Sequence, residues 1–218
     1  MKSFDAKAGV YFPINRSQVA SDPQIRQLLL QSLRSTHDWN DDTLIIEELG
    51  LCQGEVRLDV AVISGAIHGY EIKSDGDTLR RLPAQREIYN RVLDFVTVIA
   101  GKRHLSKVQK LIPDWWGLCQ VQATDNLKLE DIRPGKQNSA VDPSTLVQLL
   151  WKDEVLGVLK ELGLDRGASS KSRTVLWERL VRNIRVEELK IIVRTKLKQR
   201  VHWRSAPQRG SDGGKYPR

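Results

Sequence analysis

The apolar positions of the chain change spacing several times, and each change marks an expected element. After the helix-start pair Asp22-Pro23, with Asp22 as the expected N-cap, Leu29 and Leu33 belong to a stripe at helical spacing. A turn at Ser64-Gly65-Ala66 joins two short strand-like segments. In chain order the pattern predicts a helix at 22–36, strands at 43–48, 56–63 and 67–73, a helix from 82 to 93, a strand at 95–100, a helix at 105–111 and strands at 115–121 and 127–132.

This order of elements favours an α/β fold. The run 95–100 is continuously apolar and β-branched, which is typical of a buried parallel strand. The segment 127–132 either continues the sheet or runs along its edge. We therefore expect a mixed β-sheet with helices on its faces.

The C-terminal third has a helical pattern. Asp142-Pro143 is a second helix start, and helices are predicted at 145–162, 175–183 and 186–199. Residues 134–140 are typical of a linker. We expect three regions: a core at 1–135 that begins with an irregular segment at 1–21, a basic helical region at 141–204, and a disordered tail at 205–218 that is rich in glycine and proline.

Composition limits the class of protein. A chain of 218 residues can bury one core plus a smaller appendage, and 40% hydrophobic with 28% charged residues is ordinary for a globular protein. No apolar run is long enough to span a bilayer and the first residues lack a signal peptide, so we expect a cytoplasmic protein without a membrane partner. Cys52 and Cys119 form no Cys-x-x-Cys pair, which predicts two buried thiols rather than a disulfide framework or a zinc site.

The net charge of +8 is unevenly distributed. Residues 1–150 carry 18 Lys+Arg against 19 Asp+Glu, whereas residues 151–218 carry 17 against 8. A basic excess confined to the C-terminal third indicates a polyanionic partner, with nucleic acid ahead of anionic membrane. A solvated helix face is the alternative.

The two strands at 56–73 hold the candidate chemistry. Residues two apart share a strand face, so Glu71 and Lys73 point the same way, and the hairpin can bring Asp59 to them. Two carboxylates with the Ile72 carbonyl are ligands for Mg²⁺ or Mn²⁺, and Lys73 is then placed to activate a water. An exposed hairpin face is the alternative, but Val60 and its neighbours make these strands unusually apolar for a solvated ribbon.

Asp59 and the string Glu71-Ile72-Lys73, with a helix on either side in sequence, resemble the core of the PD-(D/E)xK nuclease superfamily. Gln85 and Tyr89 resemble the Gln-x-x-x-Tyr motif of its RecB-like and lambda-exonuclease-like branches. The longer string from Gly69 to Pro83 is similar to an uncharacterised bacterial and phage family of that superfamily. The resemblance implies a restriction-endonuclease-like sheet, metal-dependent hydrolysis of DNA, and substrate orientation by Gln85 and Tyr89.

The sequence departs from the superfamily pattern at two places. Leu58 replaces the usual proline before the first aspartate, and residues 24–36 lack the acidic residue that the first helix normally supplies. We predict that Glu48, or its neighbour Glu47, substitutes for this residue as an assisting metal ligand. Arg57 shares the strand parity of Asp59 and is expected to contact phosphate.

Other polar residues are expected to be structural. Asp75 and Asp77 lie in a Ser-Asp-Gly-Asp turn, where aspartates bond local amides. His68 and His104 are each expected to be a surface or packing residue, and at least one of Trp115 and Trp116 is expected in the core.

The basic C-terminal residues form a separate candidate surface. The segment 151–181 loosely resembles SAP-like DNA-binding modules. The cations predicted to bind phosphates are Arg182, Arg185, Lys190, Arg194, Lys196, Lys198, Arg200 and Arg204, beside Trp203.

The predicted function is a Mg²⁺- or Mn²⁺-dependent DNA nuclease. A non-catalytic nucleic-acid-binding or scaffolding protein with the same fold is the alternative, and an RNA-directed nuclease is a third hypothesis. The oligomeric state has no signature in the sequence.

Overall fold

The computed structural model describes residues 20–36, 42–123 and 126–200. Within these ranges six strands form one sheet in the order in which they occur in the chain. The strands are β1 (Leu44–Leu51), β2 (Val56–Ile63), β3 (Ile67–Lys73), β4 (Phe95–Ala100), β5 (Gly117–Ala123) and β6 (Leu127–Arg133). The helices are α1 (Asp22–Thr36), α2 (Leu82–Val92), α3 (Leu105–Leu111), α4 (Pro143–Leu146), α5 (Lys152–Glu161), α6 (Arg173–Asn183) and α7 (Val186–Gln199), with short 3-10 turns η1 (Cys52–Gly54) and η2 (Val147–Leu149).

The sheet is mixed. β1, β2 and β3 form an antiparallel meander, β4 and β5 continue it in parallel, and β6 pairs antiparallel with β5 at the edge. The predicted α/β class, the hairpin turn and the parallel strand at 95–100 are confirmed. Residues 127–133 are an edge strand of the same sheet.

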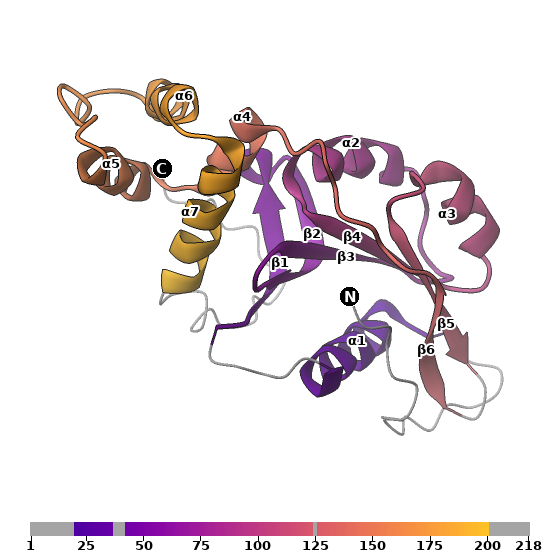
Figure 1. Cartoon of the computed structure of the whole chain (residues 1–218). Coiled ribbons are helices and arrows are strands. Elements are labelled where there is room, and N and C mark those ends of the chain that lie inside the picture. The colour runs from indigo at the N-terminus through magenta and orange to yellow at the C-terminus, as the bar shows by residue number, and fades with distance from the viewer. Residues whose placement is uncertain (1–19, 37–41, 124–125, 201–218) are drawn as a thin grey trace, which may run out of the picture.

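Helices cover both faces of the sheet (Figure 1). α1 packs its Ile25, Leu29 and Leu33 against one face, where Tyr70 and Ile72 lie. α2, α3 and the C-terminal helices cover the opposite face. The sheet therefore separates two hydrophobic clusters.

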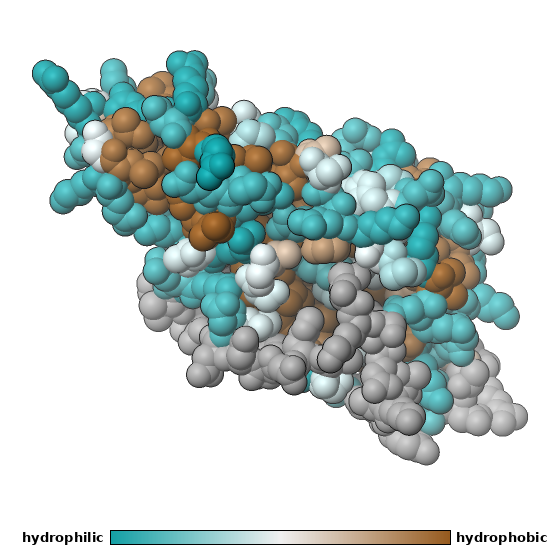
Figure 2. Space-filling model, in the orientation of Figure 1, coloured by the Kyte–Doolittle hydropathy of each residue, from teal (hydrophilic) through white to brown (hydrophobic). Residues whose placement is uncertain are grey.

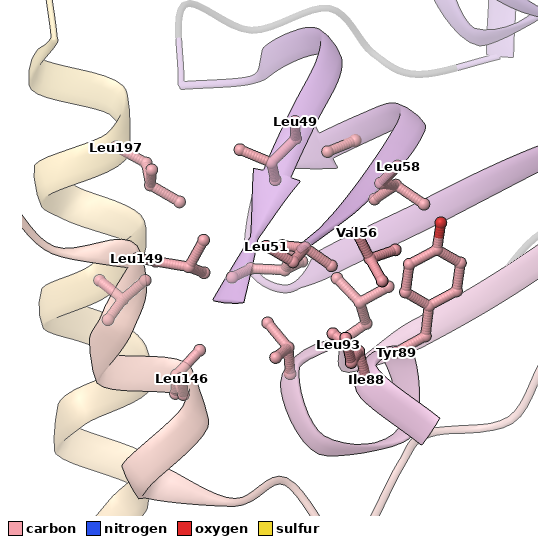
Figure 3. Close-up of a cluster of buried hydrophobic side chains, with 14 of the residues drawn as sticks. Leu49, Leu51, Val56, Leu58, Ile88, Tyr89, Leu93, Leu146, Leu149 and Leu197 are labelled. Carbon is pink, nitrogen blue, oxygen red and sulfur yellow. The ribbon is translucent and has the colours of Figure 1, made fainter. Parts of the chain in front are cut away.

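The C-terminal helices share a hydrophobic core with the sheet. Leu146, Leu149 and Leu197 belong to one hydrophobic cluster with Leu49 and Leu51 of β1, which come from a much earlier part of the chain (Figure 3). The predicted linker is also attached, because the buried Asn138 donates to the carbonyls of Asn90 and Leu93. On the outer side, hydrophobic residues gather over α5, α6 and α7 (Figure 2). The large exposed hydrophobics there are Trp151, Leu162, Val175 and Ile191.

Two helix predictions were wrong in detail. The first helix is capped by Ser21 rather than Asp22: its carbonyl accepts from the Ile25 amide, and the Gln24 side chain accepts from the Ser21 amide. The predicted helix at 145–162 is interrupted, because the backbone turns extended before α5 and the Glu154 carboxylate accepts from the Trp151 amide at 2.7 Å.

Several expectations lie outside the described residues. These are the irregular segment at 1–19, the tail at 205–218, and the side chains of Trp203 and Arg204. Within the described ranges, none of the helices has the length and apolarity needed to cross a bilayer.

Candidate active site

The site begins at an irregular rung of the β1–β2 ladder. The two strands pair at a constant register on either side of Glu48 and Asp59, but the ladder skips this pair. Glu48 has a left-handed backbone with φ 58°. On both strands, alternate side chains face the hydrophobic cluster on the α2 side of the sheet, and this alternation shifts by one residue at the skipped pair. On β2, for example, the side chains that face this cluster change from even-numbered positions, as at Leu58, to odd-numbered positions, as at Ala61. Asp59 is thereby released from ordinary strand pairing.

Asp59 lies where β2 and β3 separate. The last paired rung is Val60 with Tyr70, and beyond it the Ile72 amide donates to Asp59 Oδ2 at 2.7 Å instead of to a backbone carbonyl. The other carboxylate oxygen, Oδ1, accepts from Nη2 of Arg26 at 3.0 Å. The aspartate is therefore fixed between β3 and α1.

Glu71 and Lys73 form a buried pair on the opposite face of β3 from α1. Lys73 Nζ donates to Glu71 Oε1 at 2.6 Å, and the two residues are only 3% and 2% exposed, respectively. Gln85 Nε2 donates to the same oxygen at 2.6 Å, and the Tyr89 hydroxyl donates to Oε2 at 2.6 Å. The predicted shared face of Glu71 and Lys73 is confirmed.

Gln85 and Tyr89 are themselves buried and reach Glu71 from α2. The Gln85 amide also donates to the Tyr89 hydroxyl at 3.3 Å, as expected for residues four apart on a helix. In this structure they hold the carboxylate of Glu71. Their role in orienting substrate stays a prediction.

Burial raises the pKa of Glu71, and the nearby negative charge of Asp59 raises it further. The ammonium of Lys73 and the hydrogen bonds from Lys73 and Tyr89 act in the opposite direction. Burial and the adjacent Glu71 carboxylate likewise raise the pKa of Tyr89, so its hydroxyl stays protonated and remains a donor.

Glu48 faces Asp59 across a shared cation. Nη2 of Arg26 lies 2.8 Å from Glu48 Oε1 as well as 3.0 Å from Asp59 Oδ1. Arg57 approaches the other Glu48 oxygen at 3.5 Å, and its side chain is 62% exposed at the rim of the site. Glu48 thus lies beside Asp59, on the α1 side of the sheet, whereas Glu71 is held from α2.

The first helix supplies two site residues that sequence reasoning missed, Arg26 and Asp22. Arg26 Nη1 also donates to the Asp59 carbonyl at 2.7 Å, and Asp22 Oδ1 lies 3.5 Å from Arg26 Nη2. Burial raises the pKa of Asp22, and the charges of Asp59 and Asp77 raise it further, although Arg26 opposes them. The sequence carries only part of the signal: Asp22 and Arg26 are four apart and share a helix face, but this spacing does not show that the face docks against Asp59.

The donor set suits the predicted Mg²⁺ or Mn²⁺. Asp59, Glu71 and the Ile72 carbonyl offer only oxygen, and these ions often use one or two carboxylates completed by water. Gln85 Oε1 is buried without a hydrogen-bond partner among the described residues, which leaves one free acceptor beside Glu71. No group of three or more His, Cys, Asp or Glu side chains in the described part of the chain is arranged to hold a metal ion. Asp59 and Glu71 as metal ligands, with Glu48 as a further one, therefore stay a prediction.

The polar residues that were expected to have structural roles make local structural contacts. Asp77 accepts from the amide and the hydroxyl of Ser74, and Asp75 accepts from the Arg103 amide. His68 bonds Thr97 and stacks on a tyrosine, while His104 is buried against the Asp77 carbonyl. Trp116 is fully buried.

Comparisons with known proteins find a matching family, a relative in sequence and a solved structure with limited similarity. A family model described as bacteriophage P4 protein cII matches residues 15–207. Protein cII of enterobacteria phage P4 is 26% identical over 162 residues, which are 74% of this chain and 61% of that protein, so the chain spans less than two thirds of this relative's length. A protein of unknown function from Silicibacter pomeroyi, known by its structure, is 19% identical and covers 68% of this chain and 92% of its own, with a TM-score of 0.39. The family match includes both the sheet and the C-terminal helices.

Proposed function

The chain belongs to the bacteriophage P4 protein cII family, and we propose that it acts as a divalent-metal-dependent DNA nuclease that hydrolyses phosphodiester bonds in the cytoplasm. The observation that carries the proposal is the buried Glu71–Lys73 pair beside Asp59. A buried ion pair is costly to desolvate and is often replaceable by apolar residues without loss of stability. The presence of such a pair beside the point where β2 and β3 separate therefore supports a chemical role.

Each residue of the site has a distinct part in this proposal. A bound Mg²⁺ or Mn²⁺ would supply positive charge against the charge that develops on the phosphate. Asp59, Glu71 and the Ile72 carbonyl would hold the ion. Lys73, whose Nζ is fixed by Glu71 at 2.6 Å, orients the attacking water. Glu48 assists at the α1 side of the site.

Two further residues keep these groups in place. Gln85 and Tyr89 each donate to a different oxygen of Glu71, so the carboxylate has one orientation before substrate arrives. Arg57, at the exposed rim, is placed to contact a phosphate.

The test is a cleavage assay on linear, circular, single-stranded and branched DNA and on RNA, each with Mg²⁺, Mn²⁺ or EDTA. Asp59→Asn and Lys73→Met should each reduce metal-dependent cleavage by at least about a hundredfold, because each removes a group that acts on the reacting phosphate. The exposed Lys160→Gln, on α5, is the matched control and should cleave as the wild type does. Unchanged cleavage in both site variants, with melting curves that show folded protein, rules out this mechanism. Preference for RNA in the same assay would change the substrate but keep the site.

A non-catalytic nucleic-acid-binding protein is the second candidate, since a fold does not determine an activity. The observation that favours it is Arg26, whose guanidinium already neutralises Asp59 and Glu48. This candidate predicts DNA binding that is sensitive to salt and survives EDTA, with no cleavage under any metal. It also predicts that Mn²⁺ leaves the melting temperature unchanged, whereas a metal that binds the folded state must raise it.

A further inference from the structure

Most of the basic residues of α7 already have partners within the chain. Lys190 Nζ lies 3.1 Å from Asp94 Oδ1, and Lys198 Nζ lies 2.8 Å from Asp42 Oδ2. Arg200, just after α7, bonds both carboxylate oxygens of Glu154 at 2.7 Å and is almost fully buried. The surface that sequence reasoning favoured for nucleic acid therefore has much of its charge neutralised internally.

Two loops outside the C-terminal region meet at the end of β3, where Lys73 lies. The first is residues 74–81, between β3 and α2, and the second is residues 101–104, between β4 and α3. The Gly101 amide donates to the Lys73 carbonyl at 2.8 Å, and the Arg103 amide donates to Asp75 Oδ1 at 2.8 Å. A Cβ on Gly101 would lie 2.2 Å from that same oxygen, so the contact depends on glycine. We call residues 74–81 and 101–104 together the paired loops.

The acidic side chains of the paired loops are half-buried and hydrogen-bonded within the loops. Asp77 accepts from the Ser74 amide at 2.7 Å and from its hydroxyl at 2.6 Å, and Asp75 is bonded to the second loop. One oxygen of each carboxylate, Asp77 Oδ2 and Asp75 Oδ1, is engaged by local donors. The carboxylates therefore stabilise the loops.

The cations of the paired loops point outward. Arg80, Arg81 and Lys102 are exposed, and none of the three forms an ion pair within the described residues. The exposed Lys107 and Lys110 of α3 extend the same charge away from the site. The backbone contact between Gly101 and Lys73 brings the loop of Lys102 to the candidate active site, and the Arg81 carbonyl accepts from the amide of Gln85, a residue of that site, at 3.0 Å.

We propose that the paired loops bind the phosphodiester backbone of a nucleic acid. This inference depends on the proposed function in one respect only, namely that the neighbouring site is where the nucleic acid is cleaved. Unpaired guanidinium and ammonium groups on a rigid support bind phosphates without reading sequence. The backbone is thereby held next to Lys73 and Asp59, and the C-terminal helices are left with a structural role.

The test measures binding in EDTA, so that it does not depend on cleavage. The triple variant Arg80→Gln, Arg81→Gln, Lys102→Gln is compared with the control Lys160→Gln, Lys171→Gln, Arg185→Gln, which removes the same charge from exposed positions of the C-terminal region. Fluorescence anisotropy follows a labelled duplex of about 30 base pairs, as DNA and as RNA, between about 50 and 300 mM salt. Both proteins must melt as the wild type does.

The loop variant should bind at least about tenfold more weakly, and its slope of log affinity against log salt should be shallower by about 2 to 3, because each lost phosphate contact removes about 0.9. The control should retain both values. Equal loss in the two variants, or no loss in the loop variant, overturns the proposal. If the wild type binds RNA more tightly than DNA, and the loop variant shows the same decrease in salt dependence, the result supports the proposed binding surface and identifies RNA as its ligand. If the loop variant loses binding but the wild type cleaves no substrate, the result supports the proposed binding surface and rules out only the nuclease proposal.

Discussion

At the scale of single residues, the Glu71 carboxylate is subject to opposing influences. Burial raises its pKa first, and the charge of Asp59 adds to this, while Lys73 and Tyr89 lower it. An acid whose pKa is higher in the folded state binds more protons folded than unfolded between the two values. The metal-free protein should therefore lose stability as pH rises through the window between the ordinary glutamate pKa and the raised one.

This conclusion predicts the behaviour of two variants. Glu71→Gln should abolish the loss of stability in that pH window, as followed by urea unfolding at a series of pH values. Tyr89→Phe should raise the pH at the midpoint of the Glu71 titration, because the lost hydroxyl donated a hydrogen bond to the ionised carboxylate. Carbon NMR of the side-chain carboxyl in metal-free protein measures this midpoint.

Tyr70→Phe is the control for the tyrosine, since Tyr70 lies on the α1 face of the sheet. It should leave the Glu71 midpoint where it is. A midpoint that is unchanged or lowered in Tyr89→Phe would contradict the assigned hydrogen bond.

Much of this site could be predicted because strand alternation is local. The period of two placed Glu71 with Lys73, and the helical spacing of four placed Gln85 with Tyr89. The position of Arg26 could not be predicted in this way, because it depends on how α1 docks across the sheet. The irregular rung at Glu48 was hidden for a similar reason: its left-handed backbone has no signature in a glutamate.

At the scale of elements, a buried ion pair joins α7 to the sheet. The Asp94 side chain is 4% exposed and that of Lys190 is 9% exposed, and the Ile67 amide at the start of β3 also donates to Asp94. The Asp94 carboxylate thus links three segments that are far apart in sequence: the start of β3, the turn before β4, and α7. The helical pattern predicted α7 correctly at 186–199, but it did not reveal that this lysine points inward.

Lys190→Met should destabilise the protein by about 3 kcal/mol, because it leaves the Asp94 charge buried with only the more distant Arg194 at 4.0 Å. Lys196→Met, whose partner Glu161 is 68% exposed at 3.7 Å, should change stability by less than about 0.5 kcal/mol. Urea unfolding of both variants makes the comparison. Equal effects would mean that burial of the pair does not matter.

At the scale of the whole molecule, one hydrophobic cluster extends from the sheet into the C-terminal helices. Leu149 and Leu197 cover Leu51, and Trp177 and Leu180 complete the same cluster. Sequence reasoning separated a core at 1–135 from a helical region at 141–204 because composition and charge change there. A shared core is formed by contacts between distant segments, which a local pattern does not contain.

A chain ending at residue 140 should therefore fail to fold cooperatively, since it exposes the apolar side of β1 and β2. We expect a broad urea transition and strong binding of a hydrophobic dye. A sharp transition with the stability of the full chain would instead establish residues 1–135 as an independent domain.

The left-handed backbone at Glu48 also bears on which amino acids the position tolerates. A glutamate with φ 58° is strained by an amount on the order of 1 kcal/mol, and glycine or asparagine would adopt this conformation more readily. The carboxylate of Glu48 forms an ion pair with Arg26 at 2.8 Å, so a glycine at position 48 would relieve the backbone strain but leave Arg26 with less negative charge to neutralise it.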